Sequence, residues 1–256
     1  MKQARTSIPG GKSIDYDAIS RVYDQVREGD PEMVDHLLEG IALDTNAIVL
    51  DVGCGTANNT LLVSRALSSK LIGVDISVGM LEKARVKAPR LELLQATADD
   101  LPFSSNLFDF VFMTEVIHHL PDFKKALREM LRVLRPGSSS CIVTQSHKQI
   151  ENRMTSRFFP GSATVDKKRY PDIDKIEVAM NGVGFVRVSS RPYSFSPVIL
   201  GSDYLQRVEM RGYSMLHKIS GEEYQEGLKA LRSAFERGEK LSYSAGYTFV
   251  RGYKSK

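Results

Sequence analysis

A glycine-rich turn after a short apolar run is the part of this chain best suited to hold a small ligand. The apolar run covers residues 48–52 and ends in Gly53, Cys54 and Gly55. Glycine at such a turn lets a ligand approach backbone atoms that a Cβ would block. A helix that begins directly after the turn would present its free N–H groups and the positive end of its dipole there. The sequence therefore predicts a ligand site at this turn.

Two acidic residues accompany the turn and indicate the kind of ligand. Asp51 lies inside the apolar run, and Asp75 ends the next apolar run along the chain. An acid at the end of that second strand is placed to accept both hydroxyls of a ribose. A dinucleotide-binding fold needs a third glycine where Asn58 stands, and Asp51 would repel a pyrophosphate. The carboxylate of Asp51 suits the cationic amino group of a methionine moiety instead.

The elements that must position these residues follow from the apolar periodicity. Five short apolar runs predict buried strands, and amphipathic helical runs separate most of them. The strands are expected at residues 48–52, 71–75, 91–96, 108–113 and 141–144. The helices are expected at residues 59–67, 78–86 and 123–134, with Pro136 and Gly137 ending the last one. Strands that alternate with helices imply right-handed crossovers and a parallel sheet.

The remaining segments complete one α/β domain. Residues 1–13 are expected to form a loose arm, followed by helices over residues 16–26 and from Pro31 onward. Further elements are expected at residues 174–180 (helix), 185–189 (strand), 202–216 and 222–237 (helices) and 243–253 (strand). The predicted fold is a Rossmann-like, seven-stranded, mostly parallel sheet with helices on both faces and a helical substrate insertion before the last strand. Its parts are the arm and lid helices (1–45), the ligand-binding core (46–146) and the rest of the sheet with the insertion (147–256).

The composition excludes several classes of protein. The 256 residues carry a net charge of +4 that is spread along the chain, so charge gives little support to nucleic-acid binding. The cysteines are Cys54 and Cys141, which argues against a disulfide-stapled secreted fold. Neither a signal peptide nor an apolar stretch long enough to span a bilayer is present in the sequence. These features favour a cytoplasmic protein that does not bind a membrane.

Several motifs together resemble those of class I S-adenosylmethionine-dependent methyltransferases, particularly the group called methyltransferase type 11. The match runs from about Tyr16 to Thr144 and is specific as a set. Its pieces are the turn from Leu50 to Gly55, the acid Asp75, the acidic-Leu-Pro-Phe segment at 98–103, the strand and His-Leu turn at 109–120, and the helix-ending segment at 132–137.

The resemblance implies how the cofactor would be held. Asp51 would contact its amino acid part, Gly53 and Gly55 would leave room for that part, and Asp75 would bind the ribose. The other implied contacts are Ile76 under adenine, Asp99 or the backbone of Ala98 at the adenine amino group (Thr97 stands where members commonly have Asp), Thr114 near the sulfonium, and Tyr16 and Tyr23 on lid helices.

Catalytic residues are less clear than the cofactor site. Glu115, His118 and His119 follow the fourth strand and are weak candidates for acid–base work, since a neutral imidazole can take a proton near pH 7. No spacing of His or Cys predicts a metal site. Arginines in the region 145–242 could hold an acidic or aromatic acceptor, or could be exterior charges; they are Arg153, Arg157, Arg169, Arg191, Arg207 and Arg211.

The predicted function is direct in-line transfer of the methyl group of S-adenosyl-L-methionine to a small-molecule acceptor, with S-adenosyl-L-homocysteine as the product. Three alternatives stay open. They are an NAD-binding oxidoreductase, a tRNA or protein methyltransferase, and a non-catalytic module that binds the cofactor as a regulatory ligand. The acceptor atom, the use of a general base and the oligomeric state are left open by the sequence.

Overall fold

The computed structural model describes residues 29–244 and 246–256. The expected arm and first helix, including Tyr16 and Tyr23, lie outside the described residues. The first described helix, α2 (Pro31–Leu38), begins where Asp30 accepts a hydrogen bond from the Met33 amide and Pro31 occupies the first turn. This is the helix start expected at Pro31, since proline fits the first turn without losing a hydrogen bond.

Seven strands of the described chain form one twisted sheet in the order β3-β2-β1-β4-β5-β9-β6. Strands β1 to β5 are parallel, whereas β9 runs antiparallel to both β5 and β6. The strands are β1 (Ile48–Val52), β2 (Lys70–Asp75), β3 (Glu92–Gln95), β4 (Phe108–Thr114), β5 (Leu134–Thr144), β6 (Val186–Ser194) and β9 (Gly246–Tyr253). The predicted mostly parallel, seven-stranded fold is confirmed.

Helices cover both faces of this sheet because its strands alternate their apolar side chains between the two faces. Leu50 and Val52 of β1 pack with α5 (Phe123–Val133) and α9 (Ile173–Val183) on one face. Val49 of β1 packs with α2 and α3 (Asn58–Ala66) on the other. The crossover between β2 and β3 contains α4 (Val78–Lys87), and a short 3₁₀ turn, η1 (Ile117–His119), follows β4.

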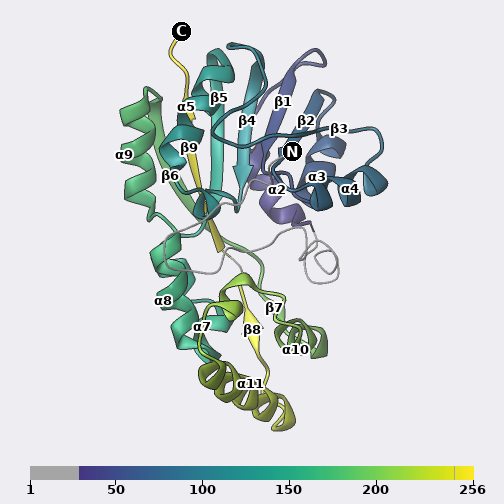
Figure 1. Cartoon of the computed structure of the whole chain (residues 1–256), viewed down its shortest axis with the longest axis vertical. Helices are drawn as coiled ribbons and strands as arrows, with labels where there is room; N and C mark the ends of the chain where they lie inside the picture. Colours follow the sequence, from purple (N-terminus) through teal and green to yellow (C-terminus); the bar gives the residue numbers. More distant parts are fainter. Residues whose placement is uncertain (1–28, 245) are drawn as a thin grey trace.

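A second group of elements, here called the helical lobe (residues 147–169 and 198–243), lies beyond the lower end of the sheet in Figure 1. It has its own core, which includes Phe159, Tyr224 and Leu231. Its elements are α6 (His147–Glu151), α7 (Met154–Phe158), α8 (Pro160–Arg169), β7 (Val198–Ile199), α10 (Ser202–Glu209), η2 (Ser214–His217), α11 (Gly221–Glu236) and β8 (Ser242–Tyr243).

The helical insertion was expected only before the last strand, but two segments build the lobe. One segment follows β5 and the other follows β6. The first was missed because α6 and α7 have five residues each, too few to show a helical period, and because α8 buries the polar residues Ser162 and Asp166 and so shows no apolar stripe.

Several predicted boundaries are wrong for local backbone reasons. Helix α5 ends at Val133, before Pro136 and Gly137, and these two residues continue β5 with Gly137 at a φ of 83°. The helix predicted over 202–216 stops at Glu209 because Arg211 adopts a left-handed φ of 50°.

The other boundary errors concern helix α9 and the last strand of the sheet. Helix α9 ends at the left-handed Gly184 and not at Asn181 and Gly182. The predicted strand 243–253 divides, since Tyr243 belongs to β8, which pairs with β7, and β9 begins at Gly246.

Candidate functional site

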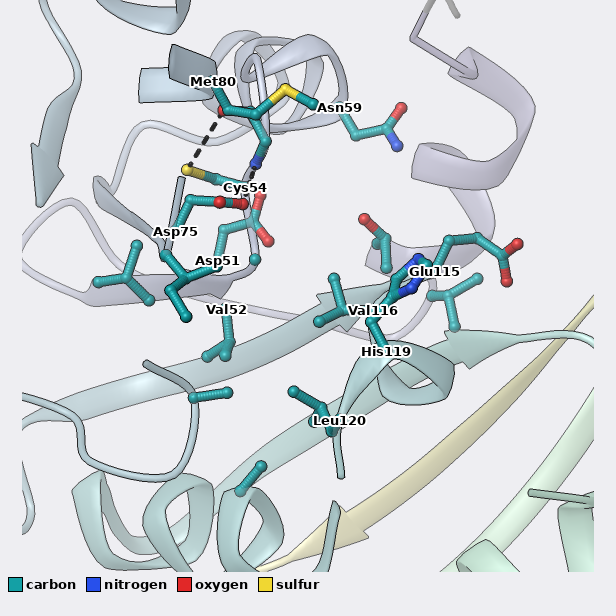
Figure 2. A pocket seen from close by; sticks show the side chains of 18 of the residues that line it. Asp51, Val52, Cys54, Asn59, Asp75, Met80, Glu115, Val116, His119 and Leu120 are labelled. Carbon is teal, nitrogen blue, oxygen red and sulfur yellow. Dashed lines mark hydrogen bonds between the residues drawn. The ribbon is translucent and has the colours of Figure 1, made fainter. Parts of the chain in front are cut away.

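A cavity of about 450 Å³ opens at the carboxyl ends of the central parallel strands. Residues of the glycine turn, of the end of β2 and of the segment after β4 line it (Figure 2). In an open parallel sheet this edge is where ligands bind, because the strand order reverses between β1 and β4. The volume suits a small molecule.

Asp51 is a buried carboxylate that lacks a full set of partners. Its side chain is 1% exposed, and Thr60 Oγ1 donates to its Oδ2 at 2.7 Å. Its Oδ1 has no hydrogen-bond partner among the residues that the structure describes, although Asp51 lines the cavity. Burial, with the nearby charge of Asp75, raises the pKa of Asp51 to about 7. A cationic donor in the cavity would satisfy this oxygen and favour its charged form.

Asp75 is oriented by backbone amides. Gly55 N donates to its Oδ2 at 2.8 Å, and Ser77 N donates to its Oδ1 at 2.9 Å. Each carboxylate oxygen has a further lone pair, so the fixed group can still accept hydroxyl donors. This arrangement is the one expected for a ribose-binding acid at the end of β2.

The two glycines of the turn serve different purposes. At Gly55, with a φ of +55°, an added Cβ would meet nothing within 4 Å, so this position is open toward a ligand. At Gly53, with a φ of +83°, an added Cβ would lie 2.3 Å from Val116 Cγ2. The absent side chain of Gly53 therefore makes room for Val116, while its backbone lines the cavity; the expected contact of Gly53 with the ligand stays a prediction.

Cys54, between these glycines, is a packing residue. Its side chain is buried, and burial raises the pKa of its thiol far above the usual range. An added Cβ at Gly73 would lie 2.9 Å from Cys54 Sγ, so the turn sits close against β2. A small side chain at position 54 allows this approach.

The other expected contacts line the cavity near the ends of β2 and β4. Ile76, Ala98 and Asp99 line it beyond β2, as expected for an adenine-binding wall, and Ile76 is 38% exposed. Thr114 lines it at the end of β4. Among the expected cofactor contacts that the structure describes, all eight therefore line one cavity: Asp51, Gly53, Gly55, Asp75, Ile76, Ala98, Asp99 and Thr114.

The three catalytic candidates separate into two groups. Glu115 and His119 line the cavity, and Figure 2 shows them across it from Asp51 and Asp75. His118 is buried behind them, and its ring stacks on Tyr170 at a centroid distance of 3.7 Å. His118 is not among the lining residues, so the structure places it in a supporting position.

Residues that sequence reasoning missed also reach this site, among them Tyr247 of β9 and Asn59 of α3, which line the cavity. Tyr170 was one of the tyrosines in the region 145–242 that the sequence offered as acceptor contacts, and its hydroxyl donates a hydrogen bond to Glu115. Tyr247 comes from a strand far along the chain, and no motif in the sequence indicated it.

The arginines considered as acceptor ligands are engaged in contacts of their own. Arg153 and Arg169 share Asp166, and Arg211 lies over the ring of Tyr224 at 3.9 Å. The other ion pairs are Arg157–Glu239, Arg191–Glu39 and Arg207–Asp203. None of these six arginines lines the cavity. Arg157 and Arg191 are exposed and fit the interpretation as exterior charges, whereas Arg153 is buried.

Within residues 29–244 and 246–256, no three His, Cys, Asp or Glu side chains gather as metal ligands. Over the same ranges, no helix combines the length and apolar character needed to cross a bilayer.

The strand order defines a Rossmann-like fold, and the glycine turn with its two acids suits a ligand that carries a ribose and a cationic amino group. Comparison with known proteins agrees: residues 50–142 match the family model for a methyltransferase domain. The demethylmenaquinone methyltransferase of Staphylococcus carnosus is 27% identical over 200 residues, which are 69% of this chain and 83% of that protein. The trans-aconitate 2-methyltransferase of an Azoarcus species is 36% identical over 126 residues, so the match spans 49% of each chain.

Solved structures share the fold. A protein of Anabaena variabilis, described as a methyltransferase from an antibiotic biosynthesis pathway, superposes with a TM-score of 0.74 at 21% identity over 89% of this chain and 99% of that one. A Haemonchus contortus phosphoethanolamine N-methyltransferase in complex with S-adenosylhomocysteine gives a TM-score of 0.61 at 19% identity over 94% of this chain and 58% of that one. The chain is a class I S-adenosylmethionine-dependent methyltransferase, and S-adenosyl-L-methionine is its cofactor.

Proposed function

We propose that this methyltransferase acts on a small-molecule acceptor by direct in-line transfer. The acceptor binds at the carboxyl ends of β4 and β5, on the side of the cavity that faces the helical lobe. Residues 46–146 hold the cofactor, and residues 147–256 add the lobe that selects the acceptor.

The observation that carries the proposal is the half-satisfied carboxylate of Asp51 in a cavity of about 450 Å³. A cationic amino group would satisfy Asp51 Oδ1, and the hydroxyls of a ribose would bind Asp75. The cavity continues past these acids to Glu115 and Tyr247, so it has room for a second, small ligand. The curated relatives compared above are named for small acceptors, demethylmenaquinone and trans-aconitate, which supports the same size class.

The residues of the chain contribute alignment and exclusion of water. S-adenosyl-L-methionine supplies a methyl group on a positively charged sulfur, which is already an activated leaving group. Asp51 and Asp75 fix the two ends of that molecule, so the methyl group is held at one place. The apolar side chains of Val116, Leu120 and Val143 line the cavity on the acceptor side and limit the access of water.

The cofactor half of the proposal is tested by calorimetric titration with S-adenosylhomocysteine. Asp75→Asn and Asp51→Asn should each weaken binding about 10- to 100-fold, because each removes a charged hydrogen-bond acceptor. Asp109→Asn is the matched control. Its carboxylate accepts from Ile48 N at 2.8 Å, at the opposite end of the sheet, and it should leave the affinity unchanged. Unchanged binding in both site variants contradicts the assigned cofactor site.

The acceptor half is tested by fractionation. Radiolabelled methyl groups from S-adenosylmethionine should be transferred to a component of the small-molecule fraction of a cell extract. Transfer confined to the tRNA or protein fraction would overturn the proposal in favour of a macromolecular acceptor. Tight cofactor binding without transfer to any fraction would favour a regulatory binding module.

A further inference from the structure

The cavity is lined by acids and by no lysine or arginine of the described residues. Its acidic lining residues are Asp30, Asp51, Asp75, Asp99, Glu115 and Asp122. The ammonium of Lys87 donates to Thr56 and Asn58, but Lys87 itself is not a lining residue and lies at the glycine-turn end. Among residues 29–244 and 246–256, a ligand carrying negative charge would therefore meet lining carboxylates and no lining lysine or arginine.

Glu115 is the acid on the acceptor side. It follows β4 directly and adopts a left-handed φ of 56°, which is strained for a residue with a side chain. The Tyr170 hydroxyl donates to its Oε2 at 3.2 Å. Val116 and Val143 line the same cavity. Backbone strain at a residue whose carboxylate lines the cavity points to a role in binding or chemistry.

A buried polar chain supports Glu115; it consists of Tyr170, which directly follows α8, and Arg153 of the helical lobe. Tyr170 is 6% exposed, and its ring stacks on His118. Burial and the charge of Glu115 raise the pKa of Tyr170 well above its usual range, so the hydroxyl keeps its proton and remains a donor. The guanidinium of Arg153 lies 5.2 Å from the centre of the Tyr170 ring.

Arg153 is itself fixed from two directions. It is 8% exposed, Nη1 donates to Asp166 Oδ2 at 2.5 Å, and Nε donates to Gln145 Oε1 at 2.6 Å. Its positive charge interacts favourably with Glu115. A nearby cation of this kind stabilises the ionised carboxylate of Glu115, which is the form able to accept a proton.

We propose that Glu115, positioned by Tyr170 and Arg153, accepts the proton of the methyl acceptor. We further assign the acceptor to a chemical class, an uncharged or cationic molecule whose nucleophile carries a proton on oxygen or nitrogen. This inference rests on the proposed function. In the step, the acceptor atom gives its proton to Glu115 and uses a lone pair, which in a protonated amine is the pair that this transfer frees, to form a bond to the methyl carbon; the carbon–sulfur bond breaks and its electron pair stays on sulfur. The acceptor's proton passes to Glu115, which releases it to water.

The charge preference is tested with three probes that share one ring system. They are 2-naphthol (uncharged), 2-naphthylmethylamine (cationic) and 2-naphthoate (anionic), each titrated calorimetrically into the protein saturated with S-adenosylhomocysteine. The naphthol or the amine should bind at least tenfold more tightly than the naphthoate. Naphthoate binding as tightly as the other two, or no binding by any probe, overturns the assigned class. Failure of S-adenosylhomocysteine to bind in the first step would instead overturn the proposed function.

The role of Glu115 is tested by Glu115→Gln in the same titration. The variant should reduce the affinity of the tighter probe at least tenfold, while the affinity for S-adenosylhomocysteine stays unchanged. Glu39→Gln is the matched control, since Glu39 also accepts a hydrogen bond from a tyrosine, Tyr193, but lies outside this cavity. An equal loss of probe binding in both variants, or no loss in Glu115→Gln, overturns the assignment.

The positioning role of Tyr170 is tested by the pH dependence of probe binding. Binding of the tighter probe should fall at low pH as Glu115 takes up a proton. In Tyr170→Phe this fall should begin at a higher pH, because the carboxylate has lost a donor that stabilises its charge. Tyr193→Phe, the same change at the remote tyrosine–glutamate pair, should leave the profile unchanged. A Tyr170→Phe profile that coincides with that of the unmodified protein overturns the positioning role.

Discussion

At the scale of single residues, some parts of the site follow from local sequence patterns, and other parts depend on the tertiary fold. Asp51, Gly55 and Asp75 could be predicted because adjacent parallel strands must bring their carboxyl ends together, here in β1 and β2. The contact between Glu115 and Tyr170 spans 55 positions and depends on where the lobe docks, so no local pattern indicates it. The same holds for Val116, whose contact with Gly53 gives that glycine a steric role.

Asp51 leads to a prediction about pH. Its pKa of about 7 means that the carboxyl is largely protonated below pH 7 in the ligand-free protein. The cationic amino group of S-adenosylhomocysteine binds the charged form, so its affinity should fall up to tenfold per pH unit below pH 7. Calorimetric titrations between pH 5.5 and 8.5 (roughly one and a half units either side of that pKa) should show this slope in the unmodified protein. Asp51→Asn should bind weakly with no such slope.

The same group should affect the stability of the ligand-free protein in the opposite sense. Its folded-state pKa lies above the usual value of 3.8, so its contribution to stability is fully present below that value and is lost as pH rises toward 7. The unfolding free energy of the unmodified protein, relative to Asp51→Asn, should therefore fall by about 1.4 kcal/mol per pH unit between about pH 4 and pH 7, and stay level above pH 7. Urea titrations at two pH values measure this difference, and a constant difference would contradict the buried, raised pKa.

Gly53 leads to a second prediction at this scale. Gly53→Ala should destabilise the fold by about 2 to 4 kcal/mol, because the residue has a positive φ and its new Cβ would collide with Val116. Adding Val116→Ala should recover the steric part of the loss and leave the backbone part. Urea unfolding of the single and double variants separates these parts. A single variant as stable as the unmodified protein would show that Gly53 is not constrained by Val116.

At the scale of elements, long periodic segments could be predicted and short or irregular ones could not. Helix α5 and strand β4 each carry a clear pattern, and both were located within a residue or two. Helix α10 ends where Arg211 turns left-handed, which the sequence does not signal because arginine has no preference for that conformation. Helix α7, with five residues, is too short to be stable alone and is held by the packing of Met154 and Phe158 against the lobe core.

Helix α11 allows a prediction with a control in the same helix. An added Cβ at Gly227 would lie 2.4 Å from both Phe158 O and Phe159 Cδ1, so α11 and α7 pack through this glycine. Gly227→Ala should therefore destabilise the lobe by about 1 to 3 kcal/mol. Gly221→Ala, in the first turn of α11 with nothing within 4 Å, should be neutral or slightly stabilising. Hydrogen exchange of the α11 amides measures both, and equal effects of the two changes would contradict the close packing.

At the scale of the whole molecule, the sheet and the helical lobe each have an apolar core of their own. The sheet core positions the glycine turn and both cofactor acids, whereas the lobe core positions Tyr170 and Arg153 only through the elements that carry them. In the proposed function the lobe selects the acceptor, so the family match over residues 50–142 bears mainly on the cofactor site.

Two matched leucine-to-alanine changes test this division. Leu231 in the lobe and Leu127 on α5 are both buried to within 1% of full burial, so each change should cost about 2 to 5 kcal/mol locally. Leu231→Ala should leave the affinity for S-adenosylhomocysteine within about twofold of the unmodified protein while weakening the binding of the tighter naphthyl probe. Leu127→Ala should lower the unfolding free energy of the sheet, and with it the protection of the β1 and β4 amides from hydrogen exchange. If Leu231→Ala weakened cofactor binding as strongly as probe binding, the lobe and the cofactor turn would form a single cooperative unit, and acceptor selection could not be assigned to the lobe alone.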